Sequence, residues 1–473
     1  MNTLVEALNR EETSTTNGMA THVSSLDSCV DLFFQAGALR GRDVIPVFSK
    51  AFAEDSEVAT KLSLWLRDVR GGAGERQLFR DIFKYLVEKD VALAYKVLKK
   101  IPELGRWDCV LAAFDTRLER DALSMINHAL RDGDALCAKW MPRKGDAAKK
   151  IRAYMQSSPK VYRKLLVSLS DTVEQKMCAR EFDKINYSHV PSVAAARYQA
   201  AFDKRDPVGY ATYRADLEKG VDKDGKTVKI CADAVYPYDV VKSLKNGKKD
   251  VADAQWNALP DYLGGSDANI LPVVDVSGSM TCGAGDNDRS ILSCLDVAVS
   301  LGLYLSERSR GDFKDVFMTF SRNPELQRVK GSLSDRYMQM RQAHLQMNTN
   351  LERMFSVLLN AAVKNEVPQE DMPSMILILS DMQFDRCVNV DLNAFEMIRS
   401  NYASAGYKMP CIVFWNLHAS NGGSPVTAHE SGAALVSGFS PSIMESVLGA
   451  DMEQFTPRGV MMKAIDKEKY SLG

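Results

Sequence analysis

The segment NILPVVDVSGSM, residues Asn269 to Met280, is the clearest indication of the fold of the C-terminal half of this 473-residue chain. It begins with a short apolar run and ends with a polar segment that contains a glycine. A short apolar run bounded by turn residues is typical of a strand that is buried on both faces. In parallel sheets, ligands bind at the carboxyl ends of such strands, so the polar segment is a candidate site.

Downstream of this stretch, apolar runs alternate with amphipathic segments. The runs DVFMTFS, SMILILSD, PCIVFWNL and AALVSGFS indicate strands, and SILSCLDVAVSLGLYLSE, LERMFSVLLNAAVK and LNAFEMIRSNYASA indicate the helices between them. Such alternation predicts a mostly parallel sheet sandwiched by helices. We therefore expect a Rossmann-like α/β domain over residues 266–473.

Upstream, residues 26–260 show apolar side chains at helical spacing, as in LSLWLRDV, LFRDIFKYLVEK and ALAYKVLKKI. Short segments rich in Gly, Pro and Asp separate these runs, which favours helices joined by tight turns. The pattern predicts an all-helical array without a repeat of fixed period, after an N-terminal tail over residues 1–25. Residues 220–265 are rich in Gly, Lys and Asp and indicate a loop-rich bridge between the two regions.

Composition places the chain among soluble globular proteins, with 45% hydrophobic and 26% charged residues. Sixty basic and 61 acidic residues give no global field toward nucleic acid or membrane. The nine cysteines form no CxxC pair and no zinc-spaced cluster, which favours reduced thiols inside a cell. The N-terminus is polar and acidic, and no run of about 20 apolar residues occurs. We expect a cytoplasmic protein without membrane contact.

Oxygen-bearing side chains in three segments predict one metal site. Asp275, Ser277 and Ser279 follow the first strand, Thr349 precedes a helix, and Asp381 ends a later strand. Carboxylate and hydroxyl oxygens suit Mg²⁺, or Mn²⁺ or Ca²⁺. A lone D-x-S-x-S sequence is also common in ordinary strand-to-helix turns, so the metal hypothesis depends on the later Thr349 and Asp381.

We expect this predicted site to bind a ligand and not to catalyse a reaction. Two carboxylates and three hydroxyls leave a position open for an acidic group of a protein partner, and Asp286 or Asp288 of the next loop is an alternative occupant. No P-loop, dinucleotide fingerprint, nucleophile elbow or zinc-protease helix occurs. Because no histidine lies close in sequence to Ser277 or Ser279, we do not expect an enzyme.

The strongest local charge asymmetry lies between residues 139 and 164, where nine basic residues face a single acid, Asp146. With Tyr154 and Tyr162 as stacking platforms, such a run is typical of RNA binding, and the alternative is a solvated helix face paired with acids of a neighbouring helix. The candidate RNA-binding residues are Lys139, Arg143, Lys144, Lys149, Lys150, Arg152, Lys160, Arg163 and Lys164.

A second charged segment, RDVRGGAGER, surrounds a pair of glycines at a predicted helix junction. Its charged residues are Arg67, Asp68, Arg70, Glu75 and Arg76. Acids and bases mixed at such a junction are more typical of an ion-pair network that holds two helices together than of a binding site.

The segments DVSGSM, MNTN and SDMQFD, in this order, resemble the metal-ion-dependent adhesion site of von Willebrand factor type A domains. That resemblance implies the same ligands, Asp275, Ser277, Ser279, Thr349 and Asp381. Glycines usually precede the threonine of this motif, whereas Met347 and Asn348 precede Thr349 here, so the sequence departs from the motif at this loop.

A wider resemblance covers residues from about Thr16 to about Gly449. The segments WLRDVRGGAGERQLFR, LGRWDCV, KWMPRK, INYSHVPSVAAARY and YPYDVV look like signatures of TROVE-type helical modules. FWNL at Phe414 and SGFS at Ser437 are similar to phrases of a bacterial and viral family of unassigned function that fuses such a module to a type A domain. In Ro-like proteins the module is a ring of HEAT-like repeats that binds RNA.

Two functions follow from these expectations. The first is an RNA-binding protein of TROVE type, part of a ribonucleoprotein, with a divalent-cation site and a role in RNA quality control or as an adaptor. The alternative is a metal-dependent protein-interaction scaffold that captures an acidic residue of a partner and does not bind RNA.

Overall fold

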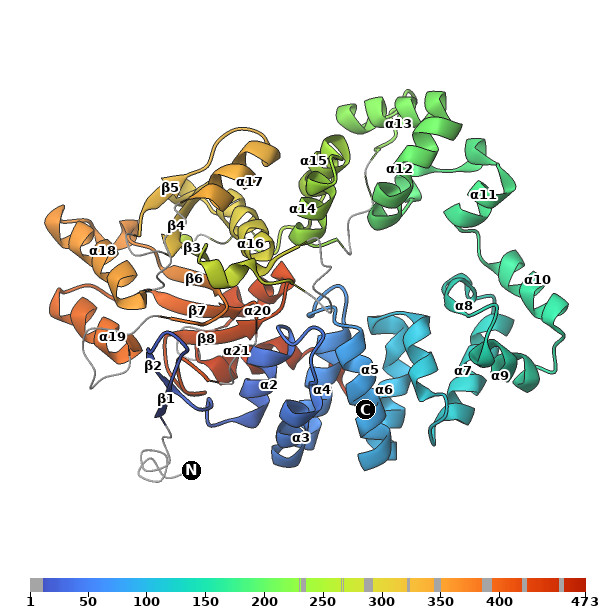
Figure 1. Ribbon diagram of the computed structural model, residues 1–473, viewed down its shortest axis with the longest axis horizontal. Coiled ribbons are helices and arrows are strands. Elements are labelled where there is room, and N and C mark those ends of the chain that lie inside the picture. Colours follow the sequence, from blue (N-terminus) through green and yellow to red (C-terminus); the bar gives the residue numbers. More distant parts are fainter. Residues whose placement is uncertain are drawn as a thin grey trace.

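The computed structural model describes residues 12–228, 230, 235–264, 266, 268–284, 292–320, 324–343, 350–384, 394–418, 423–450 and 455–473. An N-terminal helical region is followed by a region built around a mainly parallel sheet (Figure 1). This confirms the predicted order of a helical region and an α/β region. None of the helices in these described ranges has the length and apolar run that a membrane crossing needs.

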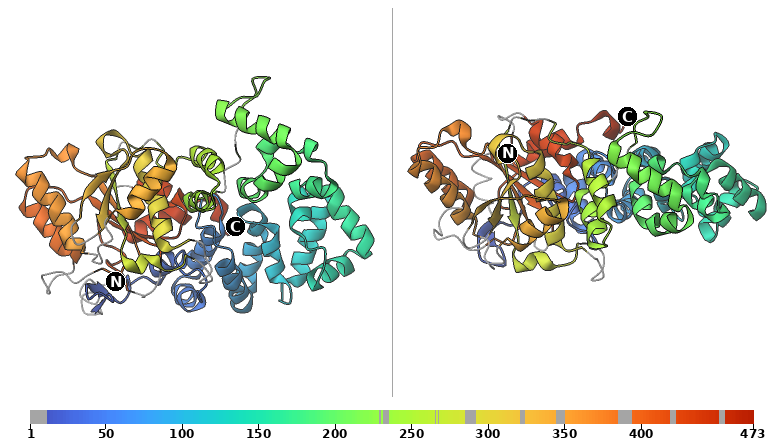
Figure 2. Two further views of the ribbon diagram at one scale, coloured as in Figure 1. Left: turned by 45° about the horizontal axis from the view of Figure 1, so that its top comes forward. Right: turned by 90° about the horizontal axis from the view of Figure 1, so that it is seen from above.

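The helical region leaves the sheet at its first helix and returns to it at its last two, and the middle helices lie farther away (Figures 1 and 2). Its helices are α2 (Ser28–Ala36), α3 (Ile45–Glu54), α4 (Ser56–Arg67), α5 (Gln77–Lys89), α6 (Val91–Leu104), α7 (Glu119–Arg131), α8 (Ala135–Trp140), α9 (Asp146–Tyr154), α10 (Pro159–Leu169), α11 (Val173–Ala179), α12 (Ser192–Arg205), α13 (Pro207–Lys219), α14 (Pro237–Lys245) and α15 (Lys249–Asn257).

Side-chain caps begin many of these helices, as the short polar punctuation between the apolar runs predicts. Asp55 caps α4, Asp90 caps α6 and Ser158 caps α10, each by accepting a backbone N–H of the first turn. The 3₁₀ helix η1 (Trp107–Ala113) follows α6, and its apolar side chains pack into the main core. Capping and amphipathic spacing together account for an array of short, packed helices.

The sheet of the C-terminal half has the strand order β5-β4-β3-β6-β7-β8. All neighbouring strands are parallel except the edge pair of β4 and β5. The strands are β3 (Ile270–Asp275), β4 (Val316–Phe320), β5 (Leu326–Arg328), β6 (Met375–Ser380), β7 (Cys411–Asn416) and β8 (Ala433–Ser437). Every residue of β3, β4, β6, β7 and β8 is buried, as continuous apolar runs predict.

The direction of winding reverses between β3 and β6. From β3 the chain adds β4 and β5 on one side, and then β6, β7 and β8 on the other. In doubly wound sheets the crevice at such a reversal, outside the carboxyl ends of the two strands, is where ligands bind. The residues that follow β3 and β6 therefore occupy the most favoured position in this fold for a binding site.

Helices flank this sheet. They are α16 (Cys294–Arg308), α17 (Leu333–Gln342), α18 (Leu351–Lys364), α19 (Ala394–Ser404), α20 (Met444–Leu448) and α21 (Pro457–Ile465). Helix α16 packs against β3, β4 and β6, and nearly all of its residues are buried. One hydrophobic cluster continues from α2 through the sheet to α21, so the two halves share a core.

The segment predicted as an N-terminal tail contains a hairpin, β1 (Glu12–Ser14) and β2 (Ala20–His22), that packs on the C-terminal half. Thr15 Oγ1 donates to the carbonyl of Phe384 at 2.5 Å, and backbone hydrogen bonds join His22 to Ser424. Behind the hairpin, α2 packs against β8 and α21. The boundaries proposed at residues 26, 260 and 266 stay predictions.

The prediction of a loop-rich bridge over residues 220–265 is wrong in part, because this segment includes α14 and α15. Val240, Val241 and Leu244 of α14 and Trp256 of α15 are buried in the main core. These apolar side chains recur at helical spacing, but glycines and lysines on either side obscure the pattern. Helix α14 packs against α16, and the chain continues from α15 into β3.

Candidate metal centre and basic surface

Asp275 is the last residue of β3, and its side chain is fully buried. One carboxylate oxygen accepts the backbone N–H of Ser277 at 2.9 Å. The other accepts the hydroxyl of Ser380, the last residue of β6, at 2.6 Å. Asp275 is therefore held across the reversal between β3 and β6 by one partner from each side.

The two serines of the DVSGSM segment lie next to each other at the start of the 3₁₀ helix η4 (Gly278–Thr281). Their Oγ atoms are 2.9 Å apart, with Ser277 buried and Ser279 exposed. Ser279 also forms a side-chain hydrogen bond with Asp381. The structure thus connects Asp275, Ser277, Ser279 and Asp381 at one end of the sheet.

Asp381 follows β6 directly and is 4% exposed. Its carboxylate accepts the backbone N–H of Gln383 at 3.2 Å. Between them, Met382 adopts a left-handed backbone with φ of 64°, which side chains other than glycine rarely take. This sharp turn aims the Asp381 carboxylate back toward the loop after β3, and strain of this kind gathers at functional sites.

The charges at this place favour a cation. Burial and the nearby Asp381 raise the pKa of Asp275 to about 7, and burial also raises the pKa of Asp381. Within the described ranges, neither carboxylate forms an ion pair with lysine or arginine. Two buried, mutually repelling carboxylates with serine hydroxyls beside them fit a hard divalent ion, which would supply the missing positive charge.

Thr349 lies outside the described residues, as do Asp286 and Asp288. The described part of the chain holds no group of three His, Cys, Asp or Glu side chains placed to bind a metal ion. A cation here would therefore depend on hydroxyl ligands beside the two carboxylates. That ligand set is the one predicted from the sequence, and occupancy by Mg²⁺ stays a prediction.

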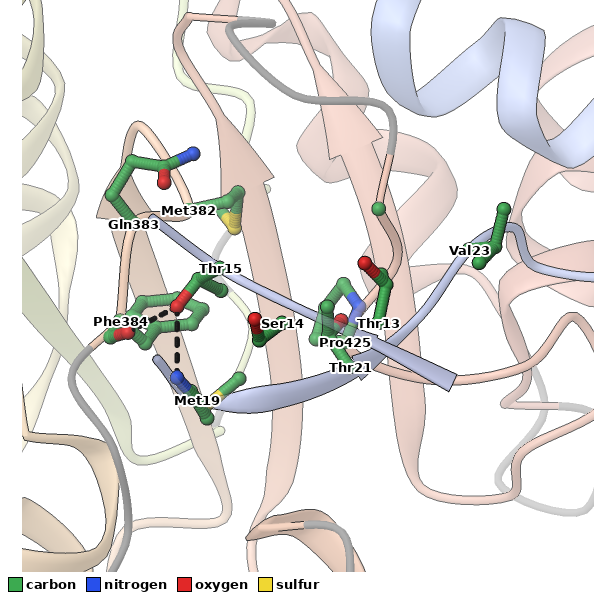
Figure 3. Close-up of a pocket in the computed structure, with 11 residues that line it drawn as sticks. Thr13, Ser14, Thr15, Met19, Thr21, Val23, Met382, Gln383, Phe384 and Pro425 are labelled. Atoms are coloured by element: carbon green, nitrogen blue, oxygen red, sulfur yellow. Dashed lines mark hydrogen bonds between the residues drawn. The ribbon is translucent and has the colours of Figure 1, made fainter. Parts of the chain in front are cut away.

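A cavity of about 370 Å³ lies beside the turn after Asp381, between that turn and the hairpin of β1 and β2 (Figure 3). Met382, Gln383 and Phe384 line one side, and hydroxyls of the hairpin, such as Thr13 and Thr21, line the other. Sequence reasoning missed this cavity because it treated residues 1–25 as an N-terminal tail.

Two thiols lie close enough to the candidate centre to interact electrostatically with Asp381. The Sγ atoms of Cys282 and Cys294 are 3.4 Å apart, because an isolated antiparallel bridge between Gly283 and Ser293 sets the two cysteines side by side. The Cys294 thiol and the adjacent His418 lower the pKa of Cys282 to about 5. Sequence reasoning also missed this thiol pair, since its members are twelve positions apart in sequence.

The predicted RNA-binding residues lie on α8, α9, α10 and the turn between α8 and α9. Several of them have local partners. Lys149 pairs with Asp146 at 2.8 Å, and Lys150 pairs with Asp115 at 2.5 Å and with Glu119 at 2.6 Å. Lys139 is half-buried near the ring of Trp140, and Arg152 donates to a backbone carbonyl of its own helix.

The other five predicted cations are exposed, and none of them has an ion pair in the part of the chain that the structure describes. They are Arg143, Lys144, Lys160, Arg163 and Lys164, of which Arg163 donates Nε to the carbonyl of Pro159 in its own helix at 3.2 Å. The expectation that Tyr162 stacks on bases is wrong, because its side chain is fully buried and its hydroxyl donates to the carbonyl of Pro142. Tyr154 is 39% exposed and stays available for stacking.

The fold and these sites define a two-part protein, in which a helical array precedes a doubly wound sheet with acidic and hydroxyl side chains at its reversal. Two sequence families match in the same order. Residues 15–100 and 144–266 match a domain of unknown function, DUF2828, and residues 269–470 match another, DUF7788. The two matches meet just before β3.

The chain is also similar to individual proteins. Uncharacterized protein L728 of Acanthamoeba polyphaga mimivirus is 28% identical over 514 residues, which cover 96% of this chain and 87% of the viral one. Among solved structures, the RO (RSR) protein of Deinococcus radiodurans is 14% identical, with 92% of this chain and 90% of that one covered and a TM-score of 0.35. That score is too low to carry functional residues from one chain to the other.

Proposed function

We propose that the helical region binds RNA through the surface of α8 to α10, as TROVE-type modules do, and that the α/β region holds a divalent cation. The observation that carries the RNA proposal is the set of five exposed cations without an ion pair, which we call the α10 surface: Arg143, Lys144, Lys160, Arg163 and Lys164. When unpaired Lys or Arg side chains neutralise phosphates, the counterions condensed on the RNA are released, which favours binding. Cations already paired with carboxylates must first give up those partners and contribute less.

The arrangement of the α10 surface supports a continuous contact with a strand of RNA. Arg143 lies near the buried Tyr162 of α10. The Tyr162 hydroxyl donates to the carbonyl of Pro142 and so connects α10 to the turn after α8. Tyr154 is the last residue of α9 and offers an exposed ring five positions before α10 begins at Pro159. Cations beside an exposed aromatic ring are the usual elements of a single-strand site, in which stacking contributes about 1–3 kcal/mol per base.

The test is binding of a fluorescent single-stranded RNA, followed by anisotropy at several salt concentrations. The triple variant Lys160→Gln, Arg163→Gln and Lys164→Gln should weaken binding and lower the salt slope by about 0.7 for each phosphate that the variant no longer neutralises. The matched control is Lys149→Gln with Lys150→Gln, which removes cations that already have acidic partners. Equal weakening in both variants, or unchanged binding in the first, would remove the α10 surface from the proposal.

A second candidate function rests on Asp275 and Asp381. A divalent cation with two carboxylates and hydroxyl ligands keeps a position for an outside oxygen. Because Ser279 is exposed while Asp275 is buried, solvent reaches this place from the Ser279 side. We propose that the cation captures an aspartate or glutamate of a partner protein there, and that the role is binding and not catalysis.

The two functions separate in one experiment. Asp275→Ala should abolish uptake of Mg²⁺ or Mn²⁺ in a calorimetric titration and leave RNA affinity unchanged, because α10 lies far from the sheet in Figure 1. The triple variant of the α10 surface should do the reverse. Absence of Mg²⁺ and Mn²⁺ uptake by the unaltered protein would end the second proposal without touching the first.

A further inference from the structure

A cavity of about 380 Å³ opens at the glycine loop between α4 and α5, remote in sequence from the sites described above. Residues after α2, the end of α4, the start of α5 and the residue before η1 form its walls. Arginine dominates the lining: Arg40, Arg67, Arg76 and Arg106 face one carboxylate, Glu75. The sequence predicts an ion-pair network here, and the structure shows that the network is incomplete.

The acids near the cavity are fewer than the guanidinium groups. Glu75 pairs with Arg40, with Oε1 2.6 Å from Nε. Asp108 is shared by three groups: Arg106, Arg80 at 3.1 Å and Arg76 at 3.9 Å. Burial and the neighbouring Arg106 lower the pKa of Arg76, as expected where positive charges outnumber negative ones.

Arg67 has no carboxylate partner in the described ranges, although it is only 1% exposed. Its Nε donates to the sulfur of Cys109 at 3.4 Å, a weak acceptor, and its buried Nη1 has no acceptor. A Cβ on Gly105 would lie 2.5 Å from that Nε, so glycine leaves the room that the guanidinium occupies. A buried, unpaired guanidinium at a cavity is costly unless an anion completes it.

The start of α5 adds a second attraction for anions. No side chain of the described residues caps this helix, whose first turn lines the cavity with Gln77 and Leu78. Free backbone N–H groups and the helix dipole favour a negative group at such an end. A hydrogen bond from Glu75 N to the carbonyl of Leu66, at 2.8 Å, holds the loop before the helix. Gly74 of this loop has φ of +73°, which glycine adopts without strain.

We infer that this cavity is a binding site for a phosphate monoester, held by the guanidinium groups of Arg67, Arg76 and Arg106 and by the first turn of α5. A guanidinium group can donate two parallel hydrogen bonds to two phosphate oxygens, and a dianion is favoured where cations outnumber acids. The volume exceeds that of a phosphate group and leaves room for a small esterified alcohol such as a nucleoside. This site is separate from the α10 surface and from the candidate metal centre.

The test is calorimetric titration of the full chain with inorganic phosphate, with adenosine 5′-monophosphate and with adenosine. Phosphate and the nucleotide should both bind, and adenosine should not. Equal affinities would identify free phosphate as sufficient, and tighter binding of the nucleotide would show that the nucleoside contributes. Absence of binding by both phosphate compounds would overturn the inference.

Variants locate the binding in this cavity. Arg76→Gln removes a half-exposed cation and should weaken phosphate binding about tenfold. Arg70→Gln is the matched control, because Arg70 is exposed on the same loop and does not line the cavity. Gly105→Ala should also weaken binding, since the added methyl group displaces the Arg67 guanidinium, and thermal unfolding will show whether each variant folds. If Arg70→Gln and Arg76→Gln weakened phosphate binding equally, the binding would depend on the protein's overall charge, and the proposed site would be refuted.

Discussion

Lys245 of α14 and Asp296 of α16 form an ion pair, with Nζ 2.7 Å from Oδ2, that fastens the returning end of the helical region to the sheet region. The Asp296 side chain is 1% exposed and the Lys245 side chain 29% exposed. The hydroxyl of Tyr337 and the backbone N–H of Ser293 also donate to this carboxylate. The buried Asp296 carboxylate therefore forms an ion pair and further hydrogen bonds at a position that is nearly closed to water.

Removing the lysine should destabilise the protein. We expect Lys245→Met to lower the free energy of unfolding by about 1–3 kcal/mol, because a buried carboxylate loses its closest cation. Urea denaturation followed by circular dichroism measures the change. Lys242→Met is the control, because Lys242 is exposed on the same helix and has no ion pair in the described residues, and it should change the free energy by less than about 0.5 kcal/mol.

Because of the same carboxylate, we expect the free energy of unfolding to depend on pH. Burial acts to raise the pKa of Asp296, but the hydrogen bonds from Lys245 and Tyr337 outweigh it and lower the pKa below the usual 3.8. A depressed carboxyl pKa stabilises the folded state above the unfolded pKa, and the contribution disappears as pH falls through the folded pKa. The difference in unfolding free energy between the unaltered protein and Asp296→Asn should be constant from pH 7 to 5 and shrink below about pH 4. A difference that grows on acidification would contradict the assignment.

The candidate metal centre predicts opposite effects with and without cation. In the presence of a chelator, Asp275→Asn should not lower the melting temperature, because it removes one of two repelling buried carboxylates. With Mg²⁺ at about a hundred times its Kd, the unaltered protein should gain about 2.7 kcal/mol and Asp275→Asn should gain nothing. Asp312→Asn, at an exposed position of the same region, serves as control and should keep the Mg²⁺ response.

The thiol pair predicts selective alkylation. At pH 6.5, iodoacetamide should modify Cys282 roughly tenfold faster than the exposed Cys178, because the Cys294 thiol and His418 favour the Cys282 thiolate. Peptide mass spectrometry after a timed reaction compares the two sites in one sample. His418→Gln should slow the reaction at Cys282 and leave Cys178 unchanged. Equal rates at both cysteines in the unaltered protein would refute the lowered pKa.

The elements that local patterns control were predictable from the sequence. A buried parallel strand needs a continuous apolar run, so β3 and β6 were identifiable, and with them the positions of Asp275 and Asp381 at their ends. The amphipathic helices of the N-terminal half followed in the same way. Thr349 stays a prediction, because it lies outside the described residues.

Features that depend on contacts between distant segments were not predictable. The hairpin of β1 and β2 is too short and polar to show alternation, and it exists because Thr15 and His22 find partners near residues 384 and 424. The same holds for Tyr162. Its position in a basic run suggested an exposed ring, whereas the side chain is buried in the core. The incomplete pairing of Arg67 required knowing where every nearby carboxylate lies.

The contact between α2 and β8 bears on how the chain folds as it is made. The backbone N–H of Gly37 donates to the Ser437 hydroxyl at 3.0 Å across 400 residues of sequence. At about 5–20 residues per second, a ribosome needs roughly 20–80 s to reach that partner after Gly37 has been added. Throughout this interval α3 and α4 can already pack on α2, but the part of the helix that contacts β8 and α21 stays exposed until those elements have been made.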